Sequence, residues 1–294
     1  MEDINQNLIP ETTNLEIAVT KPKRLGIKKN NKEKTLNNDV NFQAFYALAE
    51  LMNKSVEEVK DECCLFQVRN IMNKLTKVIV RYNVSDKELE KILVNCDTLN
   101  TNGIMVSPTY LPAIMRQKKK QNLKVNVCSV IDFPFGESLF KSKLNDVRDS
   151  IKMGVNGVTV MLPAMLLEGK NVKQFKKQSK KIGKIKRVET SISLSAMDLT
   201  SEQIKTAFKI TERTKLNAVT FIFGDVGLEE FREKMTVINK YRGKKPIMIL
   251  ANVENVSAVQ ELIKDQVDGI LTPFADEIGT ELLKRFDIKS VKVK

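Results

Sequence analysis

Histidine is absent from the 294 residues of this sequence. Its absence excludes Ser-His and Cys-His nucleophile pairs, HExxH zinc sites and acid–base catalysis by imidazole. Tryptophan is absent as well, and aromatic residues make up only 6% of the chain, which leaves little with which to stack on bases and read a nucleic-acid sequence. An enzyme made from this chain would have to use lysine, carboxylates, tyrosine, cysteine or a hard cation held by oxygen.

Cysteine is scarce and long apolar runs are missing. The cysteines include the adjacent pair Cys63 and Cys64 but no CxxC pair, so we expect reduced thiols rather than disulfides or a zinc site. No apolar run reaches the roughly 20 residues that a membrane helix needs, and the acidic, amide-rich start has no secretory signal. We therefore expect a cytoplasmic protein with no membrane contact, no metal and no cofactor.

Composition divides the chain into three regions. Residues 1–40 are polar and partly basic, without a helical or strand period, so we expect a disordered basic tail. In residues 41–75 apolar side chains recur at three- and four-residue spacing, and Ser55 with Glu58 forms a capping-box pattern, which predicts a helical extension. Residues 76–294 alternate between strand-like and helix-like segments.

Eight short segments rich in Val, Ile and Phe, separated by amphipathic helices, are typical of parallel strands that are covered on both faces. They lie at residues 78–81, 103–107, 124–131, 157–162, 187–194, 218–223, 247–251 and 269–271. Such units in one row predict a closed (β/α)8 TIM barrel of the α/β class rather than an open sheet. Three similar segments, VNGVT (155–159), LNAVT (216–220) and VDGIL (267–271), each end a predicted helix and begin a predicted strand, as expected for a βα array.

Lysine is abundant, and the formal net charge of +13 favours attraction to polyanions. A candidate basic surface consists of Lys118, Lys119, Lys120, Lys173, Lys176, Lys177, Lys180, Lys181 and Lys184. The last six recur at three- and four-residue spacing, which places them along one face of a predicted helix. Such a face suits an acidic partner or a nucleic-acid backbone, although an ordinary solvated outer face is the alternative.

Several motifs in the middle of the chain resemble a known family. Residues 107–112 (SPTYLP) look like the end of strand two in deoxyribose-phosphate aldolases, and residues 127–136 (VCSVIDFPFG) are similar to their strand-three motif. Residues 149–169 follow the next motif of the family in order and spacing, and residues 199–204 (LTSEQI) match the start of helix five. The resemblance covers about residues 76–286 and implies the class I aldolase barrel.

The resemblance also implies a particular chemistry. In this family a lysine on strand six forms a Schiff base, a lysine on strand seven lowers the pKa of the first, and an aspartate on strand four moves protons. The aspartate position is occupied here by Thr159, the Schiff-base position by Phe221 and the strand-seven position by Leu250. The glycines and serines of the phosphate site correspond to residues 252–255 and 273–274. We therefore expect no catalytic residue of this family's kind.

Polar residues that follow the predicted strands should gather at the carboxyl end of the barrel, where active sites of this fold lie. The candidate pocket consists of Ser107, Asp132, Asp225, Asn252 and Glu254. Converging carboxylates there could act as acid and base or bind Mg²⁺. Alternatively, Asp225 and Glu254 cap the helices that follow them.

One leading hypothesis and two alternatives follow. We expect an aldolase-like barrel that has lost aldolase activity, a pseudoenzyme in a regulatory or scaffolding role. It would bind a protein partner or a second copy of itself, and its basic tail could contact an anionic partner without specificity. One alternative is an active aldehyde-lyase with a displaced lysine, and the other is a barrel enzyme with altered, carboxylate-based chemistry.

Overall fold

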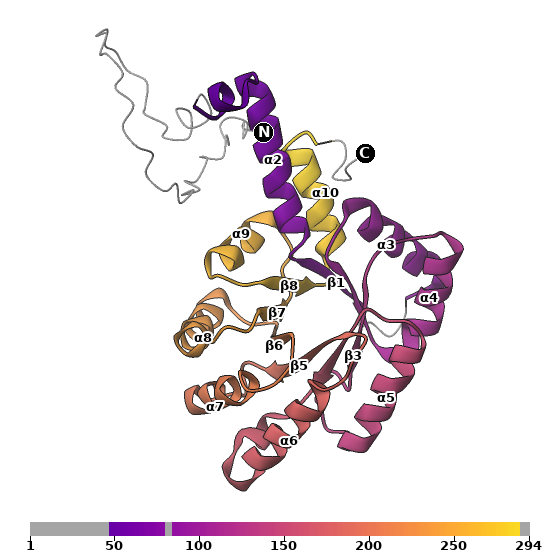
Figure 1. The fold of residues 1–294 in the computed structure, drawn as a ribbon, viewed down its shortest axis with the longest axis vertical. Helices are drawn as coiled ribbons and strands as arrows, with labels where there is room; N and C mark the ends of the chain where they lie inside the picture. The colour runs from indigo at the N-terminus through magenta and orange to yellow at the C-terminus, as the bar shows by residue number, and fades with distance from the viewer. Residues whose placement is uncertain (1–46, 80–83, 289–294) are drawn as a thin grey trace, which may run out of the picture. The chain divides into compact units, whose positions relative to one another are not determined.

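The computed structural model describes residues 47–79 and 84–288. The chain divides into two units, Met1–Ala44 and Phe45–Lys294, and every described residue belongs to the second. The tail expected at residues 1–40 therefore lies outside the described residues. In the second unit parallel strands pair in chain order and the eighth returns to the first (Figure 1), which closes the barrel and confirms the predicted (β/α)8 fold.

Strands and helices alternate through the barrel. The strands are β1 (Leu75–Ile79), β2 (Gly103–Val106), β3 (Val127–Ile131), β4 (Gly157–Met161), β5 (Glu189–Ser195), β6 (Ala218–Gly224), β7 (Ile247–Ala251) and β8 (Gly269–Thr272). The α-helices are α2 (Val56–Met72), α3 (Asp86–Leu99), α4 (Leu111–Lys120), α5 (Phe140–Lys152), α6 (Val172–Ile182), α7 (Ser201–Thr211), α8 (Leu228–Tyr241), α9 (Val256–Lys264) and α10 (Ala275–Arg285). Short 3-10 helices are η1 (Pro108–Tyr110), η2 (Ala164–Leu167) and η3 (Gly169–Asn171). No helix within the described ranges is long and apolar enough to cross a membrane.

Helix α2 begins at the predicted capping box. The Ser55 hydroxyl accepts a hydrogen bond from the backbone N–H of Glu58, and the Glu58 carboxylate accepts one from the backbone N–H of Ser55 at 2.8 Å. The helix buries Val59, Val68 and Met72. Val68 and Met72 belong to the main hydrophobic core, so this helix packs on the barrel.

The first strand begins earlier than the sequence predicts. β1 starts at Leu75 rather than at residue 78, and α2 ends at Met72, so the helix stops short of residue 75. Thr76 and Lys77 hide the strand in the sequence because both are polar. In the fold both are buried, and burial of a polar group requires a partner. The Thr76 hydroxyl accepts a hydrogen bond from the Asn102 amide at 2.9 Å, and the partners of Lys77 are described below.

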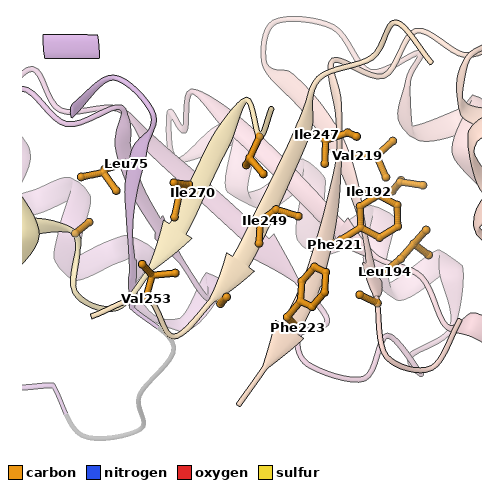
Figure 2. Packing of buried hydrophobic residues seen from close by; sticks show 14 of the residues in the cluster. Leu75, Ile192, Leu194, Val219, Phe221, Phe223, Ile247, Ile249, Val253 and Ile270 are labelled. Carbon is orange, nitrogen blue, oxygen red and sulfur yellow. The ribbon is translucent and has the colours of Figure 1, made fainter. Parts of the chain in front are cut away.

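The core has two layers, separated by the wall of the barrel. The outer layer lies between strands and helices, and Figure 2 shows the part in which Phe221 of β6 lies across from Ile249 of β7. The inner layer lies across the barrel axis and consists of Val78, Met105, Val130, Met161, Ile222, Leu250 and Leu271. Because successive side chains of a strand point to opposite faces, residues of the two layers alternate along the strands.

The repeated helix-to-strand motif supplies hydrogen bonds at the amino ends of the strands. Asn156, Asn217 and Asp268 stand directly before β4, β6 and β8. Their side-chain oxygens accept backbone N–H groups at the start of β3, β5 and β7, respectively, at 2.8–2.9 Å. The polar residue of each repeated segment therefore accepts a hydrogen bond from a backbone N–H of the neighbouring strand and also forms part of the turn.

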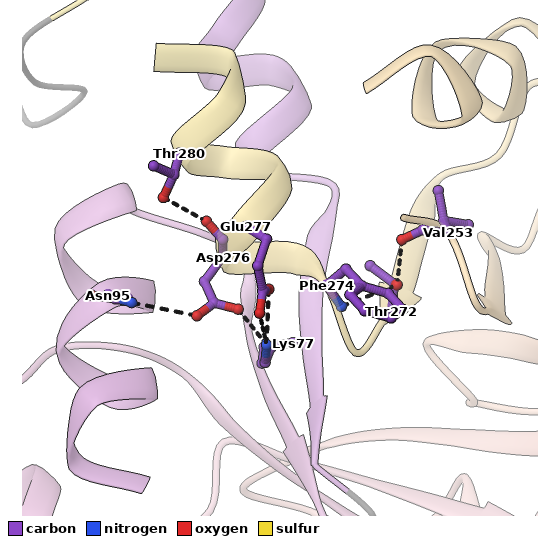
Figure 3. A network of polar contacts seen from close by, with 8 residues as sticks. All are labelled: Lys77, Asn95, Val253, Thr272, Phe274, Asp276, Glu277 and Thr280. Atoms are coloured by element: carbon purple, nitrogen blue, oxygen red, sulfur yellow. Dashed lines mark hydrogen bonds and ion pairs between the residues drawn. The ribbon is translucent and has the colours of Figure 1, made fainter. Parts of the chain in front are cut away.

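Lys77 points outward from β1 into a buried polar network with α3 and α10 (Figure 3). Its ammonium group binds Asp276 and lies 3.0 Å from the Glu277 carboxylate, and the Asn95 amide donates to Asp276 at 3.4 Å. The Lys77 and Asp276 side chains are each 7% exposed. This ion pair joins the first strand of the barrel to the last helix, and its two residues are 199 positions apart in the sequence.

The network predicts a large cost for the loss of one partner. Asp276→Asn should lower the free energy of unfolding by about 3 kcal/mol, because the buried Lys77 cation loses its buried counter-charge and keeps only the exposed Glu277 carboxylate. Glu277→Gln is the matched control, and it should cost about 0.5 kcal/mol because this carboxylate is 59% exposed. Urea denaturation measures both, and equal losses would contradict the dominant role of the buried pair.

Candidate functional site

The predicted pocket residues all follow strands at the carboxyl end of the barrel, but they do not form one pocket. Asp225, Asn252 and Glu254 line a single cleft between α8 and α9. Asp132 lies in a separate cluster in the loop between β3 and α5. Ser107 is half-buried at the start of η1 and does not line the cleft.

Asp132 organises the loop between β3 and α5. Its carboxylate accepts hydrogen bonds from the N–H and the hydroxyl of Ser138, at 2.9 and 2.7 Å, and lies 3.0 Å from Lys143 Nζ. Lys143, on α5, is 2% exposed and also donates to the carbonyl groups of Gly136 and Met161. The three ammonium protons thus have three acceptors. Because two of these acceptors, Asp132 and Gly136, are in the loop and the third, Met161, ends β4, Lys143 connects the loop to the end of β4.

The pKa values of this pair are shifted in the same direction for different reasons. Burial lowers the pKa of Lys143, and the nearby Asp132 carboxylate opposes that shift. Burial acts to raise the pKa of Asp132, but hydrogen bonds from Ser138 and Lys143 outweigh it and hold that pKa below its ordinary value of 3.8. Asp132 is therefore ionised at neutral pH, and its contribution to stability is lost as the pH falls through its lowered pKa.

Apolar side chains close the barrel axis at this end. The inner core layer includes Met161, Ile222 and Leu250, which lie near the carboxyl ends of their strands, and Phe133 from the β3–α5 loop packs on the layer. The described strands contain one lysine, Lys77 of β1, and it points away from this layer toward α10. The loop that Asp132 organises therefore also covers the mouth of the barrel.

The positions carried over from the family face in different directions. Thr159 lines a cavity inside the barrel, and Leu250 belongs to the inner layer, so both point to the axis. Phe221 instead points outward and packs on α7. The assignment of Phe221 to an axial Schiff-base position is therefore wrong, because the alternation of β6 places Thr220 and Ile222 on the axis. Neither of these neighbours is a lysine.

The cleft between α8 and α9 has a volume of about 570 Å³. The Asn252 amide donates to the Asp225 carboxylate in its wall, and Arg232 of α8 lies 3.4 Å from Glu261 of α9. Only two of the three candidate carboxylates meet here. Within residues 47–79 and 84–288, no three His, Cys, Asp or Glu side chains are placed to hold a metal ion.

The helices beside this cleft are capped by other residues than the sequence suggests. Gly227 occupies the N-cap position of α8, and Asn255 occupies that of α9, where its side chain accepts from the N–H of Ala258 at 3.0 Å. The alternative in which Asp225 and Glu254 are the caps is therefore wrong. Both carboxylates are exposed on the cleft instead.

The predicted basic surface lies on two helices that are separated by α5. On α6 Phe175 and Ile182 are buried, and every predicted lysine of this segment is exposed, which confirms the predicted orientation. On α4 Lys118 is half-buried, while Lys119 and Lys120 are exposed. These lysines, namely Lys118, Lys119, Lys120, Lys173, Lys176, Lys177, Lys180, Lys181 and Lys184, form no ion pair with another residue of the described chain.

Lys143 is the polar residue of this region that the sequence analysis missed. The buried face of α5 consists of Lys143, Leu144, Val147 and Ser150. A lysine that shares a helical stripe with leucine and valine is the signal that could have identified it. Such a residue needs a buried acceptor, and Asp132 of the preceding loop supplies one.

The Asp132–Lys143 pair predicts an acid-sensitive loop. Asp132→Asn should lower the free energy of unfolding at neutral pH by about 3 kcal/mol, because the Lys143 cation loses its buried partner. The wild type should lose stability as the pH falls below 3.8, the ordinary pKa of an aspartate, because Asp132 becomes protonated. The variant has no carboxylate at this position, so its loss of stability over the same pH range should be smaller. Asp149→Asn breaks an exposed pair with Lys152 on the same helix and should cost about 0.5 kcal/mol. Urea denaturation across pH separates these outcomes, and the same loss in both variants would contradict the assignment.

No protein-family model matches the chain. It is 22% identical over 219 residues to the deoxyribose-phosphate aldolase of Mycoplasmoides pirum, which covers 70% of this chain and 95% of that protein. It is 21% identical over 200 residues to the deoxyribose-phosphate aldolase of Thermoanaerobacter pseudethanolicus, which covers 65% of this chain and 89% of that protein.

Solved structures show the same fold. The aldolase QR15 has a TM-score of 0.65 at 18% identity and covers 75% of this chain and 99% of its own. The deoxyribose phosphate aldolase from Aeropyrum pernix has a TM-score of 0.62 at 13% identity and covers 74% of this chain and 96% of its own. The sequence motifs, the closed barrel and both comparisons agree: the proteins that this chain resembles in sequence and in fold are deoxyribose-phosphate aldolases.

Proposed function

We propose that this protein is an aldolase-like barrel that forms no Schiff base and acts by binding a partner, in a regulatory or scaffolding role. The observation that carries the proposal is the closed carboxyl end of the barrel axis. Seven apolar side chains form a layer across the axis, and Phe133 packs against them. Among the described strands only β1 carries a lysine, Lys77, and its ammonium group pairs with Asp276 outside the barrel wall. Class I aldol chemistry needs a neutral amine that can reach the carbonyl carbon of the substrate.

Lys143 is the residue to test for a displaced lysine. Burial lowers its pKa, which favours the neutral form that a nucleophile needs. Its side chain, however, is 2% exposed and donates to Asp132, Gly136 and Met161. Attack on a substrate would break these contacts and leave the Asp132 carboxylate without its cation. We infer that Lys143 holds the loop and does not react.

Borohydride trapping tests the loss of Schiff-base chemistry. The full chain is incubated with deoxyribose 5-phosphate and borohydride and weighed intact by mass spectrometry, beside an active aldolase as a positive control. We expect no adduct on this protein, because no axial lysine is available. A stoichiometric adduct would overturn the proposal, and its absence from Lys143→Arg would identify Lys143 as a displaced nucleophile. Turnover that Asp225→Asn or Glu254→Gln abolishes would instead support the carboxylate-based alternative.

The surface best suited to a partner is the lysine face of α6. Its lysines are exposed and have no ion pair in the described chain, whereas Lys152, Lys205 and Lys264 on other helices each pair with an acidic residue three positions earlier. Like charges at this spacing destabilise a helix by a few tenths of a kcal/mol per pair. An acidic protein segment lying along the helix would relieve that repulsion, so we infer an acidic protein partner.

Polyglutamate serves as a probe of this surface. The test variant changes Lys173, Lys176, Lys177 and Lys180 to Gln, and the control variant changes four exposed lysines elsewhere, Lys87, Lys91, Lys244 and Lys284. At about 0.35 kcal/mol for each exposed contact, the α6 variant should bind roughly tenfold more weakly in fluorescence anisotropy. The two variants have the same net charge. If both bind polyglutamate equally weakly, overall charge explains the effect, and the proposal that α6 is the binding surface is contradicted.

A further inference from the structure

We propose that the amino end of the barrel holds a second site, one that binds a small, uncharged, polyhydroxylated molecule of about pentose size. The site is a cavity on the barrel axis, at the end opposite the expected aldolase site. It does not depend on whether the barrel has lost aldol chemistry, because its entrance lies at the opposite end of the barrel and it shares only Met105 and Leu271 with the apolar layer.

The cavity has a volume of about 340 Å³, at the lower end of the range for small-molecule pockets. Its lining includes Asn102, Asn126, Asn156 and Asn217, which stand before β2, β3, β4 and β6 and are exposed. The cavity therefore opens between asparagines at the amino ends of the strands. Leu271 belongs both to its lining and to the inner core layer, so this apolar layer closes its far end.

Hydroxyl groups line the interior of the cavity. The Thr159 and Ser191 hydroxyls are hydrogen-bonded to each other, and Thr159 Oγ1 lies 3.8 Å from Cys128 Sγ. Thr220 also lines the cavity and is 1% exposed, so its side chain lies on the inner wall. A hydroxyl on the wall of such a space can donate to and accept from a bound molecule or water.

The amides at the entrance add further donors. Asn156 and Asn217 use their side-chain oxygens to accept the backbone N–H groups of Val127 and Thr190. Their amide NH₂ groups have no acceptor in the part of the chain that the structure describes. The entrance thus presents N–H donors, while the interior presents hydroxyls that both donate and accept. A polyol, whose hydroxyls also donate and accept, matches both parts.

The charges at the cavity disfavour a phosphorylated ligand. No lysine or arginine is among the residues that line it, and its one ionisable carboxylate belongs to Glu189. A phosphate group would enter without a counter-charge and would be repelled by this carboxylate. Cys128 does not supply a charge, because burial raises the pKa of its thiol to about 12. The lining therefore favours an uncharged ligand over an anionic one.

The test compares ribitol with ribitol 5-phosphate, which differ only in the phosphate. Binding to the full chain is measured by saturation-transfer NMR and by titration. We expect ribitol to bind and its phosphate ester to bind severalfold more weakly. Failure of ribitol to bind, or tighter binding of the ester, would overturn the proposal, and the first result would assign the cavity to water alone.

Two variants locate the binding. Thr220→Val removes a hydroxyl from the inner wall of the cavity and should weaken ribitol binding by up to about tenfold, the equivalent of one hydrogen bond. Thr236→Val, on the exposed face of α8, is its control and should leave binding unchanged. Glu189→Gln alters only the exposed rim, so it keeps the test decisive if Thr220→Val fails to fold. It should bring the ester closer to ribitol in affinity, and an unchanged preference would contradict the role of Glu189.

Discussion

The closed ladder of parallel strands assigns every strand residue either to the barrel axis or to the surrounding helices, and the other features of the molecule depend on that division. Outward positions such as Phe221 build the core beneath the helices. Inward positions change character along the axis, and β6 shows the change within two residues, since Thr220 lines the polar cavity and Ile222 belongs to the apolar layer. The barrel is therefore polar at its amino end and closed at its carboxyl end, where sites of this fold usually lie.

Two buried lysines connect parts of the barrel that apolar packing alone would leave separate. Lys77 joins β1 to Asp276 of α10, and Lys143 joins α5 to Asp132 and to the end of β4. Each cation loses hydration on burial, and only a paired carboxylate with additional hydrogen bonds offsets that cost. The geometry of both pairs is consequently specific. A lysine held in this way connects two elements of the structure and is poorly suited to attack a substrate.

The sequence sufficed for the architecture and for much of the surface, but not for the direction of individual side chains. Short Val- and Ile-rich segments between amphipathic helices predict a parallel barrel, and lysines at helical spacing predict the exposed face of α6. Strands buried on both faces are apolar at successive positions, so their pattern does not reveal which residues face the axis. This explains the wrong assignment of Phe221. The start of β1 was obscured because the partner of Lys77 is Asp276, far away in the sequence.

The cavity could not be read from the sequence because it arises from small side chains on different strands. Gly103, Gly157 and Ala218 line it beside the hydroxyl-bearing residues Ser191 and Thr220, and together they leave space that larger side chains would fill. A space of this kind lined by apolar atoms would remain dry and would cost stability. Here hydroxyls and amides share the wall with apolar side chains such as Met105, Met248 and Leu271, so the cavity can take up molecules that form hydrogen bonds. Water is always available for this, so a ligand gains only what its contacts add beyond those of the waters that it displaces. Selectivity between a neutral polyol and its charged ester is therefore more informative about this cavity than affinity alone.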